Sequence, residues 1–433
     1  MPQELIQLNP RKIIVRLFLL VLLSAAGVWS YFVVRWYTGN TLAEYFNSSG
    51  NDMRVADMAR SLAPDDPLTH WRMAQVRQKS LPLDQQVQAI AEYEKAVSLS
   101  PNDYRFWMSL GTASEQAGET AKAEQALRRA VELAPAYSYP RWYLGNLLLR
   151  NGRYDEAFAE LRLASQADPE LQPQQFNLIW EVYNSNPEAL QKSVGESPKA
   201  RAEFGLYLLG RQKYEDGLRM WESLKNDEKR SNRQTGEAIV TSLIAAYRFH
   251  DALRVWNDIV NEKFRAEVGR VFDGGFEEAS SYGQEMVFGW QVKGVQGLQI
   301  GIDDRSHGGA NSLRLIFHVR TNIEDVNIVQ LVPVAPNTEY DFEFYVATEK
   351  IETGSPPLVQ LVDPTTGGVL AASPAAAIGT SEWNRIGLTF KTGGKTEAVM
   401  IKVVRPSCGT KEAPICPIFG SVWYDDFSLK RRS

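Results

Sequence analysis

Residues 106–135, FWMSLGTASEQAGETAKAEQALRRAVELAP, carry the pattern that decides the fold of the first half of the chain. Its defining positions are Trp107, Leu110, Gly111, Ala123, Leu127, Ala130 and Pro135. The pattern returns thirty-four residues later at Leu144, Gly145, Ala157, Leu161, Ala164 and Pro169, and it occurs one period earlier at Ala89, Tyr93, Ala96 and Pro101. A period of this length predicts pairs of antiparallel helices, because small residues let two helices cross closely and proline ends the second one.

This spacing resembles the tetratricopeptide repeat, in which a Trp-x2-Leu-Gly motif is followed by a small, a bulky and a small residue and then a proline. Weaker copies lie on both sides. Residues 53–64 read as a lone second helix, and later partial matches occur at Gly205, Tyr214, Gly217, Trp221, Phe249, Ala252 and Trp256. The period is lost between Leu171 and Ala200, although this segment still reads as helical. We therefore expect about five or six helical pairs between residues 41 and 264, the last ones irregular.

The resemblance implies a concave groove, formed by the first helix of each pair, in which a protein partner would bind. In the family's register the groove presents Trp71, Arg105, Met108, Thr112, Tyr139, Trp142 and Asn146. Trp142 stands one place after the usual core position, which Arg141 occupies, and one residue turns a side chain by about 100° around a helix. Two interpretations stay open. An exposed Trp142 would anchor a peptide or helix of the partner, or it packs on the neighbouring repeat.

The N-terminal segment 13–34, IIVRLFLLVLLSAAGVWSYFVV, is predicted to cross a membrane. At about 1.5 Å per residue it spans roughly 33 Å, against a hydrocarbon core of about 30 Å. Basic residues cluster at its N-terminal side, at Arg11, Lys12 and Arg16. Since positive charge stays in the cytoplasm, the chain is expected to be oriented with its N-terminus inside.

The predicted organisation follows from this orientation. Residues 1–12 form a cytoplasmic tail, 13–37 a signal-anchor helix of the inner (cytoplasmic) membrane, and 38–265 the helical repeats, with everything after the anchor periplasmic or otherwise extracytoplasmic. A cleavable signal peptide, with its cleavage site at Ser24-Ala25-Ala26, is the alternative, and it exports the remainder equally.

Composition excludes some functions and supports the exported location. The 433 residues carry a net charge of −5, which gives no electrostatic reason to expect nucleic acid. Four histidines and two cysteines leave almost no ligands for a zinc site. Cys408 and Cys416 lie close enough to close a small loop, and in an oxidising compartment we expect a disulfide that stabilises by roughly 2–3 kcal/mol. Two unrelated thiols are the alternative.

After Phe264 the periodicity changes from helical to alternating, which indicates strands. Strands are predicted at 313–319, 326–334, 340–346, 358–362, 385–391, 398–404 and 421–429. Turn-forming pairs such as Pro336-Asn337 and Gly393-Gly394 separate them. Many short strands with such punctuation favour an antiparallel β-sandwich.

Several motifs in residues 266–433 resemble the carbohydrate-binding modules of families four and nine, which share the galactose-binding-like jelly roll. The motifs are 272–277 (FDGGFE), Gly289-Trp290, Gly309 with Ser312-Leu313, 330–336 (QLVPVAP) leading into Tyr340, Trp383, and 423–429 (WYDDFSL). The resemblance implies a glycan-binding sheet face, and strand parity points these side chains away from the core: Arg314, His318, Gln330, Glu343, Tyr345 and Gln360. Tyr345 would stack on a sugar ring while the others bind hydroxyl groups. An ordinary solvated face is the alternative.

The same resemblance implies a structural calcium ion near the two ends of the domain. Asp273, Glu277 and Asp425, with Glu278 and Asp426 beside them, could supply the oxygen ligands. Asp425 shares strand parity with Phe427 and Leu429 and is therefore expected to point inward, where a carboxylate needs a partner or a cation. Hydrogen bonds to the backbone or to an arginine are the alternative.

No nucleophile elbow, zinc-protease, P-loop or dinucleotide motif occurs in the sequence, and no catalytic cofactor or catalytic residue is expected. We therefore expect a membrane-anchored scaffold of the cell envelope and not an enzyme. Its repeats would bind a protein partner and its β domain a glycan, in the assembly or export of surface polysaccharide. The alternative is a purely protein–protein scaffold in which the β domain is structural or contacts protein.

Overall fold

The computed structural model describes residues 12–45, 53–79, 83–184, 186–278, 286–294, 296–319, 325–406, 408 and 416–432. Two compact units make up the chain, Met1–Gly195 and Glu196–Ser433. The predicted cytoplasmic tail, residues 1–12, lies outside the described residues except for its last position. Each unit is considered by itself.

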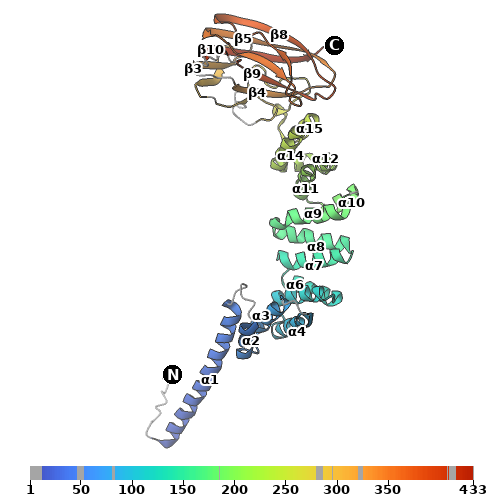
Figure 1. Cartoon of the computed structure of the whole chain (residues 1–433), viewed down its shortest axis with the longest axis vertical. Coiled ribbons are helices and arrows are strands. Elements are labelled where there is room, and N and C mark those ends of the chain that lie inside the picture. Colours follow the sequence, from blue (N-terminus) through green and yellow to red (C-terminus); the bar gives the residue numbers. More distant parts are fainter. Residues whose placement is uncertain are drawn as a thin grey trace, which may run out of the picture. The chain divides into compact units, whose positions relative to one another are not determined.

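The first unit is helical throughout its described residues (Figure 1). Its helices are α1 (Ile13–Tyr45), α2 (Met53–Leu62), α3 (Pro67–Gln78), α4 (Leu83–Leu99), α5 (Tyr104–Gln116), α6 (Thr120–Leu133), α7 (Ser138–Arg150), α8 (Tyr154–Ala167), η1 (Pro169–Leu171), α9 (Gln172–Tyr183) and α10 (Pro187–Val194). Consecutive helices pack as the pairs α3–α4, α5–α6 and α7–α8, as the 34-residue period predicted. The aperiodic segment after Leu171 is helical, as expected.

Glycine marks the crossing point inside each clear pair. A Cβ atom on Gly111 would lie 2.6 Å from Cγ of Leu127, and one on Gly145 would lie 2.7 Å from Cγ of Leu161. Such a contact is too short for any side chain, so the spacing of glycine and leucine in the sequence records the closeness of the two helices. The start of α5 is set by Asp103, whose carboxylate accepts a hydrogen bond from the backbone N–H of Arg105.

The long helix α1 contains the predicted membrane span, and its C-terminal end is also part of the repeats. A Cβ atom on Gly39 would lie 2.8 Å from Cβ of Ala63 and 2.9 Å from the carbonyl oxygen of Ala59, which repeats the geometry at Gly111. The end of α1 is therefore the first helix of a pair whose second helix is α2. The prediction that residues 53–64 form a lone second helix is wrong, because its partner is hidden in the continuation of the apolar segment.

Five further helices of the second unit lead into the sheets. They are α11 (Pro198–Gly210), α12 (Tyr214–Glu222), α13 (Asn226–Ser231), α14 (Arg233–Ala245) and α15 (Phe249–Ile259), followed by the short helix η2 (Glu262–Phe264). Trp256 of α15 packs its ring against Phe288, and Nε2 of His250 lies 2.9 Å from the carbonyl oxygen of Val334. These helices and the β domain thus belong to one unit. The boundary between the two units falls after Gly195, whereas the sequence predicted a domain boundary at residue 265.

The β domain consists of two five-stranded antiparallel sheets in the described residues. The strands are β1 (Gln291–Val292), β2 (Leu298–Asp303), β3 (Ser312–Val319), β4 (Asp325–Pro333), β5 (Glu339–Thr353), β6 (Leu358–Val362), β7 (Val369–Ala372), β8 (Gly379–Lys391), β9 (Ala398–Val404) and β10 (Ile418–Arg431). One sheet has the order β1-β4-β9-β6-β7 and the other β2-β3-β10-β5-β8. A single buried core collects side chains from both sheets, among them Phe317, Phe342 and Ile401. All seven strands predicted from alternation are present, whereas the short strands β1, β2 and β7 were not predicted.

Candidate functional site

A groove in the first unit is lined by the end of α1 and by α3, α4 and α5 and encloses about 780 Å³. Trp71, Arg105 and Thr112 lie in it together, although Trp71 and Thr112 are 41 positions apart in the sequence. The groove forms where the first helices of successive pairs, α1, α3 and α5, each contribute lining side chains. Three of the seven residues predicted for the groove thus line one hollow, and its binding of a protein stays a prediction.

Hydrogen bonds between side chains order the floor of this groove. Nε1 of Trp71 donates to Oγ of Ser109 at 2.9 Å. The hydroxyl of Tyr93 donates to Oε1 of Gln78 at 2.7 Å, and Nε2 of Gln78 donates to Oε1 of Gln116 at 2.8 Å. Three helices are thus joined across the groove by polar groups, so its floor offers amides and hydroxyls and not a bare apolar surface.

The groove has more basic than acidic side chains along its walls. Arg72, Lys79 and Arg105 line it, together with one acidic residue, Glu44. Arg105 is held in place by Asp103, with 2.5 Å between Nη2 and the carboxylate. The arrangement can receive a ligand that carries negative charge, since guanidinium groups bind carboxylates through charge-assisted hydrogen bonds.

The other predicted groove residues do not line this groove. Met108 is half-buried and packs on the core of the next pair, and Tyr139 is 53% exposed on α7. Trp142 is half-buried, and its carbonyl oxygen accepts a hydrogen bond from Nδ2 of Asn146 at 2.8 Å. The family register thus identified α3 and α5 as parts of the groove, but it missed α1 and α4, and the three residues that it placed on α7 lie outside the groove.

Sequence reasoning missed several residues of the groove. Gln75 and Gln78 follow Trp71 on α3 at helical spacing, and Lys79, directly after α3, follows Gln75 by four, so the periodicity starting at Trp71 could have identified these three; Arg72 stands beside Trp71 and does not fit it. Glu44 could not be found in this way, because the end of α1 reads as the margin of an apolar span.

Behind the groove, a buried ionic cluster ties α3 to α2 and α4. Nδ1 of His70 lies 2.6 Å from Oε2 of Glu92, and Nε2 of His70 lies 2.8 Å from the carbonyl oxygen of Pro64. Arg60 donates to the other carboxylate oxygen of Glu92 at 2.8 Å. Burial opposes the ionisation of Glu92, but the hydrogen bond with His70 and the charge of Arg60 outweigh it and lower the pKa of the carboxyl. The cluster fixes the helices that carry the groove.

A second pocket, of about 1030 Å³, lies in the β domain. It is bordered by residues 262–275, by β5 and by the end of β10. Of the six predicted glycan-binding residues, Glu343 and Tyr345 line it, and His307 and Asp426 join them. The predicted set is therefore only partly brought together.

Two of the six predicted glycan-binding residues belong to the sheet β1-β4-β9-β6-β7, whereas β5 and β10 of the pocket belong to the other sheet. Gln360 lies on β6, and Gln330 lies on β4 and is fully buried. The prediction that Gln330 faces away from the core is wrong, because it shares a face with the buried Ile328 and Val332. Leu331, on the other face of β4, packs on the helical core. Both faces of β4 therefore carry packed apolar side chains, so its sequence does not alternate between apolar and polar residues.

Arg314 and His318 lie on the outer face of β3, as parity predicted, but outside the pocket. The guanidinium of Arg314 lies over the ring of Trp423, 4.9 Å from its centroid, and Arg305 lies 4.5 Å from the same centroid. Arg314 also forms an ion pair with Asp303 at 2.9 Å. Arg314 thus covers the ring of Trp423 on this face of the sheet.

Tyr345 is not an open stacking platform. The imidazole of His307 is stacked on its ring, with 3.5 Å between the ring centroids. Nδ1 of His307 lies 2.6 Å from a carboxylate oxygen of Asp426, which holds the imidazole there. Glu343 is likewise engaged, in an ion pair with Arg385 and in a hydrogen bond from Ser428 at 3.2 Å. A sugar ring could stack on Tyr345 on this side only if His307 moved.

The three predicted calcium ligands are bound by backbone amides. Oδ1 of Asp273 accepts from the N–H of Glu277 at 2.8 Å, Oε1 of Glu277 from the N–H of Ala310 at 2.8 Å, and Oδ2 of Asp425 from the N–H of His307 at 2.7 Å. Within the described residues, no three His, Cys, Asp or Glu side chains gather closely enough to hold a metal ion. The geometry gives no support to the calcium site, which stays a prediction.

The inward orientation predicted for Asp425 is wrong. A register shift between Asp425 and Ser428, with Asp426 at a φ of 48°, inserts an extra residue into β10. Asp425 therefore shares the outer face with its partner Tyr345, while Phe427 faces the core. Burial under the 307–308 backbone raises the pKa of Asp425, and burial likewise raises that of Asp273.

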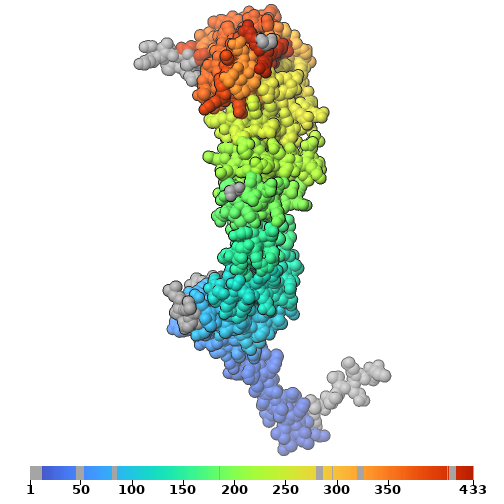
Figure 2. Space-filling view, turned by 90° about the vertical axis from the view of Figure 1, so that its right-hand side faces the viewer, coloured from blue at the N-terminus to red at the C-terminus, as the bar shows by residue number. Residues whose placement is uncertain are grey.

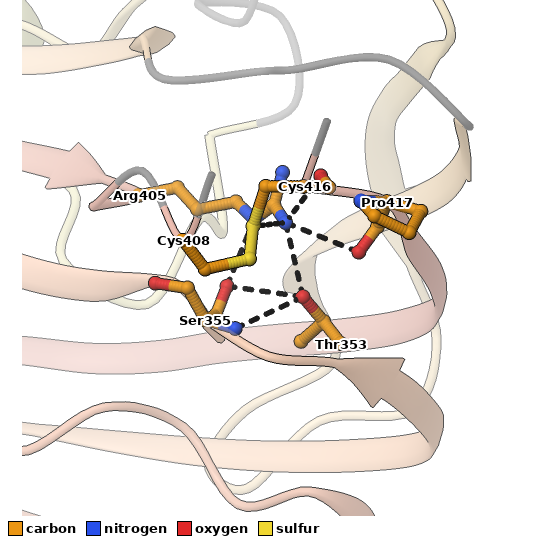
Figure 3. Close-up of a disulfide and its surroundings, with 6 residues drawn as sticks. All are labelled: Thr353, Ser355, Arg405, Cys408, Cys416 and Pro417. Carbon is orange, nitrogen blue, oxygen red and sulfur yellow. Dashed lines mark hydrogen bonds between the residues drawn. A yellow bond between two sulfur atoms is a disulfide. The ribbon is translucent and has the colours of Figure 1, made fainter. Parts of the chain in front are cut away.

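Cys408 and Cys416 form the predicted disulfide (Figure 3). The buried guanidinium of Arg405 lies beside it and donates through Nη2 to the carbonyl oxygen of Cys416 at 2.7 Å. The Nε atom of Arg405 donates to the carbonyl oxygen of Ser355 at 2.8 Å, and Nη2 also reaches Oγ1 of Thr353 at 3.0 Å. The cysteine that closes the loop is thus joined to the end of β5, and burial lowers the pKa of Arg405.

Comparison with known proteins confirms the repeats. Two family models of the tetratricopeptide repeat match residues 88–138 and 115–179. The chain therefore contains tetratricopeptide repeats, as the 34-residue period predicted. No curated protein matches the chain.

Solved structures resemble separate parts of the chain. MamA from Desulfovibrio magneticus RS-1, from residue 41 to its end, is 13% identical with a TM-score of 0.29, covering 43% of this chain and 92% of that one. YrrB, described as a TPR protein with an unusual peptide-binding site, is 13% identical with a TM-score of 0.26, covering 48% and 91%. A CBM4 structure is 10% identical with a TM-score of 0.27, covering 37% and 99%. Similarities this low carry no argument about function.

Proposed function

We propose that this protein is a non-catalytic scaffold, anchored in the inner membrane by α1, that holds a protein partner outside the cytoplasm. The observation that carries the proposal is the groove of the first unit. Trp71 and Arg105 both line this groove, and hydrogen bonds between side chains order its floor. The repeats themselves support a protein partner, because stacked helical pairs form extended binding surfaces.

The exposure of α1 supports the anchor. Leu17, Leu20 and Val34 are each about 60% exposed, and no part of the apolar stretch is buried against the protein. Figure 2 shows the N-terminal, apolar part of α1 projecting away from the other helices of the first unit. An exposed apolar area of this size is unfavourable in water, which supports the proposal that α1 lies in lipid. Cleavage after Ala26 would leave the exposed Trp29 and its apolar neighbours on the mature chain, which favours an uncleaved anchor.

The proposal is tested by photo-crosslinking in native cells. A benzoylphenylalanine replaces Gln75 in the groove of the full-length chain, and the matched control replaces Lys95, which is exposed on α4 outside the groove. The proposal expects a protein adduct from position 75 that position 95 does not give, and its reduction by Trp71→Ala. Equal adducts from both positions, or none from position 75, would reject it. Trp142→Ala is expected to leave the adduct intact, since Trp142 lies outside the groove.

A second candidate function is glycan binding by the β domain, with a role in surface-polysaccharide assembly or export. The pocket that contains Glu343, Tyr345 and His307 supports it, because carboxylate, hydroxyl and imidazole groups face a space large enough for a sugar. In this view the two sheets form a jelly-roll sandwich.

The test is a glycan-array screen of the full-length chain in detergent, with and without calcium. Saturable binding that is lost in Glu343→Gln and retained in Gln360→Met, on the other sheet, would establish the site. Absence of binding by the folded protein would leave the purely protein–protein scaffold.

A further inference from the structure

We propose that the partner in the groove is a second integral membrane protein, bound through an acidic extracytoplasmic segment that adjoins one of its transmembrane spans. This inference rests on the proposed function and specifies the partner. It follows from two observations on the first unit: the groove begins on α1, the helix that the proposed function places in the membrane, and basic groups outnumber acidic ones along its walls.

The first step is that the end of α1 is joined to the helices that carry the groove. Arg35, directly after the apolar stretch, donates through Nη2 to the carbonyl oxygen of Ser61 at 2.6 Å. Gly39 is in close contact with α2, and Nδ2 of Asn40 donates to the buried carboxylate of Asp66 at 2.8 Å. Asp66 is also the N-cap of α3, which carries most of the groove. The helix therefore cannot bend away from the repeats without breaking these contacts.

The second step is the height of the groove above the bilayer. Ala43 is the first residue of α1 that lines it, and it follows Val34, the last residue of the apolar stretch, by nine positions. At about 1.5 Å per residue the groove begins roughly 14 Å beyond the hydrocarbon core. An extended chain rises about 3.3 Å per residue, so a segment leaving the bilayer reaches this point in about four residues. Crossing α3 and α5, with helices about 10 Å apart, adds about six more.

The third step is charge. Arg72 on α3 and Lys79 directly after it line the groove with one acidic residue, Glu44, whereas Arg105 on α5 is already paired with Asp103. Acidic side chains in the incoming segment would meet the guanidinium and ammonium groups. A basic segment would be repelled, so the groove selects by sign.

The experiment maps the attachment point of the adduct from position 75 on its partner by mass spectrometry of digested native membranes. The expected attachment lies in another integral membrane protein, within about fifteen residues of a transmembrane span, in a segment with net negative charge. Arg72→Glu with Lys79→Glu is expected to reduce the adduct at least tenfold, and Arg72→Lys with Lys79→Arg is expected to keep it.

A helical insertion tests the height directly. Seven residues, AEAAKAA, placed between Val34 and Arg35 keep the facing of α1 and raise the groove by about 10.5 Å. The attachment point should move about three residues further from the partner's span. An attachment point that does not move, or one in a water-soluble protein, in a lipid headgroup or in a second copy of this chain, would overturn the inference and leave the groove's role in binding intact. Lack of any adduct specific to position 75 would instead reject the proposed function itself.

Discussion

Replacing Gln330 with methionine should destabilise the β domain, although the sequence first placed this residue in a glycan site. Oε1 of Gln330 accepts from the backbone N–H of Phe272 at 3.1 Å, and its Nε2 donates to the carbonyl oxygen of Phe272 at 2.8 Å. The side chain is fully buried, so in the variant both backbone groups of Phe272 would face a thioether in place of their hydrogen-bond partner.

The magnitude follows from these two bonds. An orphaned backbone group costs about 1–3 kcal/mol when it is fully buried, and Phe272 is half-buried, so each of its two groups should cost about 1–2 kcal/mol. Methionine keeps nearly the same volume, so the change should lower the free energy of local unfolding by about 2–4 kcal/mol. Since about 1.4 kcal/mol corresponds to a factor of ten, amide exchange in the 271–274 segment should accelerate roughly thirty- to seven-hundred-fold.

Hydrogen exchange by mass spectrometry on the full-length chain in detergent is the suitable assay, because it reads this segment separately from the other unit. Gln360→Met is the matched control. It makes the same chemical change on the same sheet at a residue that is only half-buried, and it should alter stability by less than about 0.5 kcal/mol. Unchanged exchange in Gln330→Met would refute the structural role and return this residue to the list of ligand-binding candidates.

Further predictions concern the anchor, acid stability and the disulfide. Gly39→Leu should separate α1 from α2, which should lower stability by about 1–3 kcal/mol and speed limited proteolysis of α2. Gly27→Leu is the control, because a Cβ atom there meets no atom within 4 Å. Equal proteolysis of the two variants would contradict the pairing of α1 with α2. The pKa of Glu92 is lowered from 4.5, so its stabilisation is present above that pH and is lost as the pH falls through the folded-state pKa. Glu92→Gln should therefore show a flatter loss of stability in acid titrations, and parallel curves would count against the cluster. Reduction of Cys408–Cys416 should lower stability by roughly 2–3 kcal/mol, and the double serine variant should not respond to reductant; a responsive double variant would show that the reductant acts elsewhere.

Local sequence patterns determined much of this molecule. The 34-residue period identified the helical pairs, because the glycine that permits a close crossing and the leucine that fills it lie on adjacent helices at a fixed separation. Alternation located strands such as β6 and β9 with correct bounds, because in each of them core residues alternate with residues that are only partly buried. The spacing of Cys408 and Cys416 likewise predicted their disulfide.

Only the tertiary structure decided which side chains meet. Gln330 sits on a strand covered on both faces, Asp425 lies before a bulge that reverses parity, and Tyr345 is covered by His307 from a distant loop. The groove depends in the same way on the end of α1, whose role as a first repeat helix is masked by the apolar run before it. Periodicity records which face of an element is apolar. What covers that face, and which polar groups are brought together on it, depends on contacts between residues far apart in the chain, which no local pattern specifies.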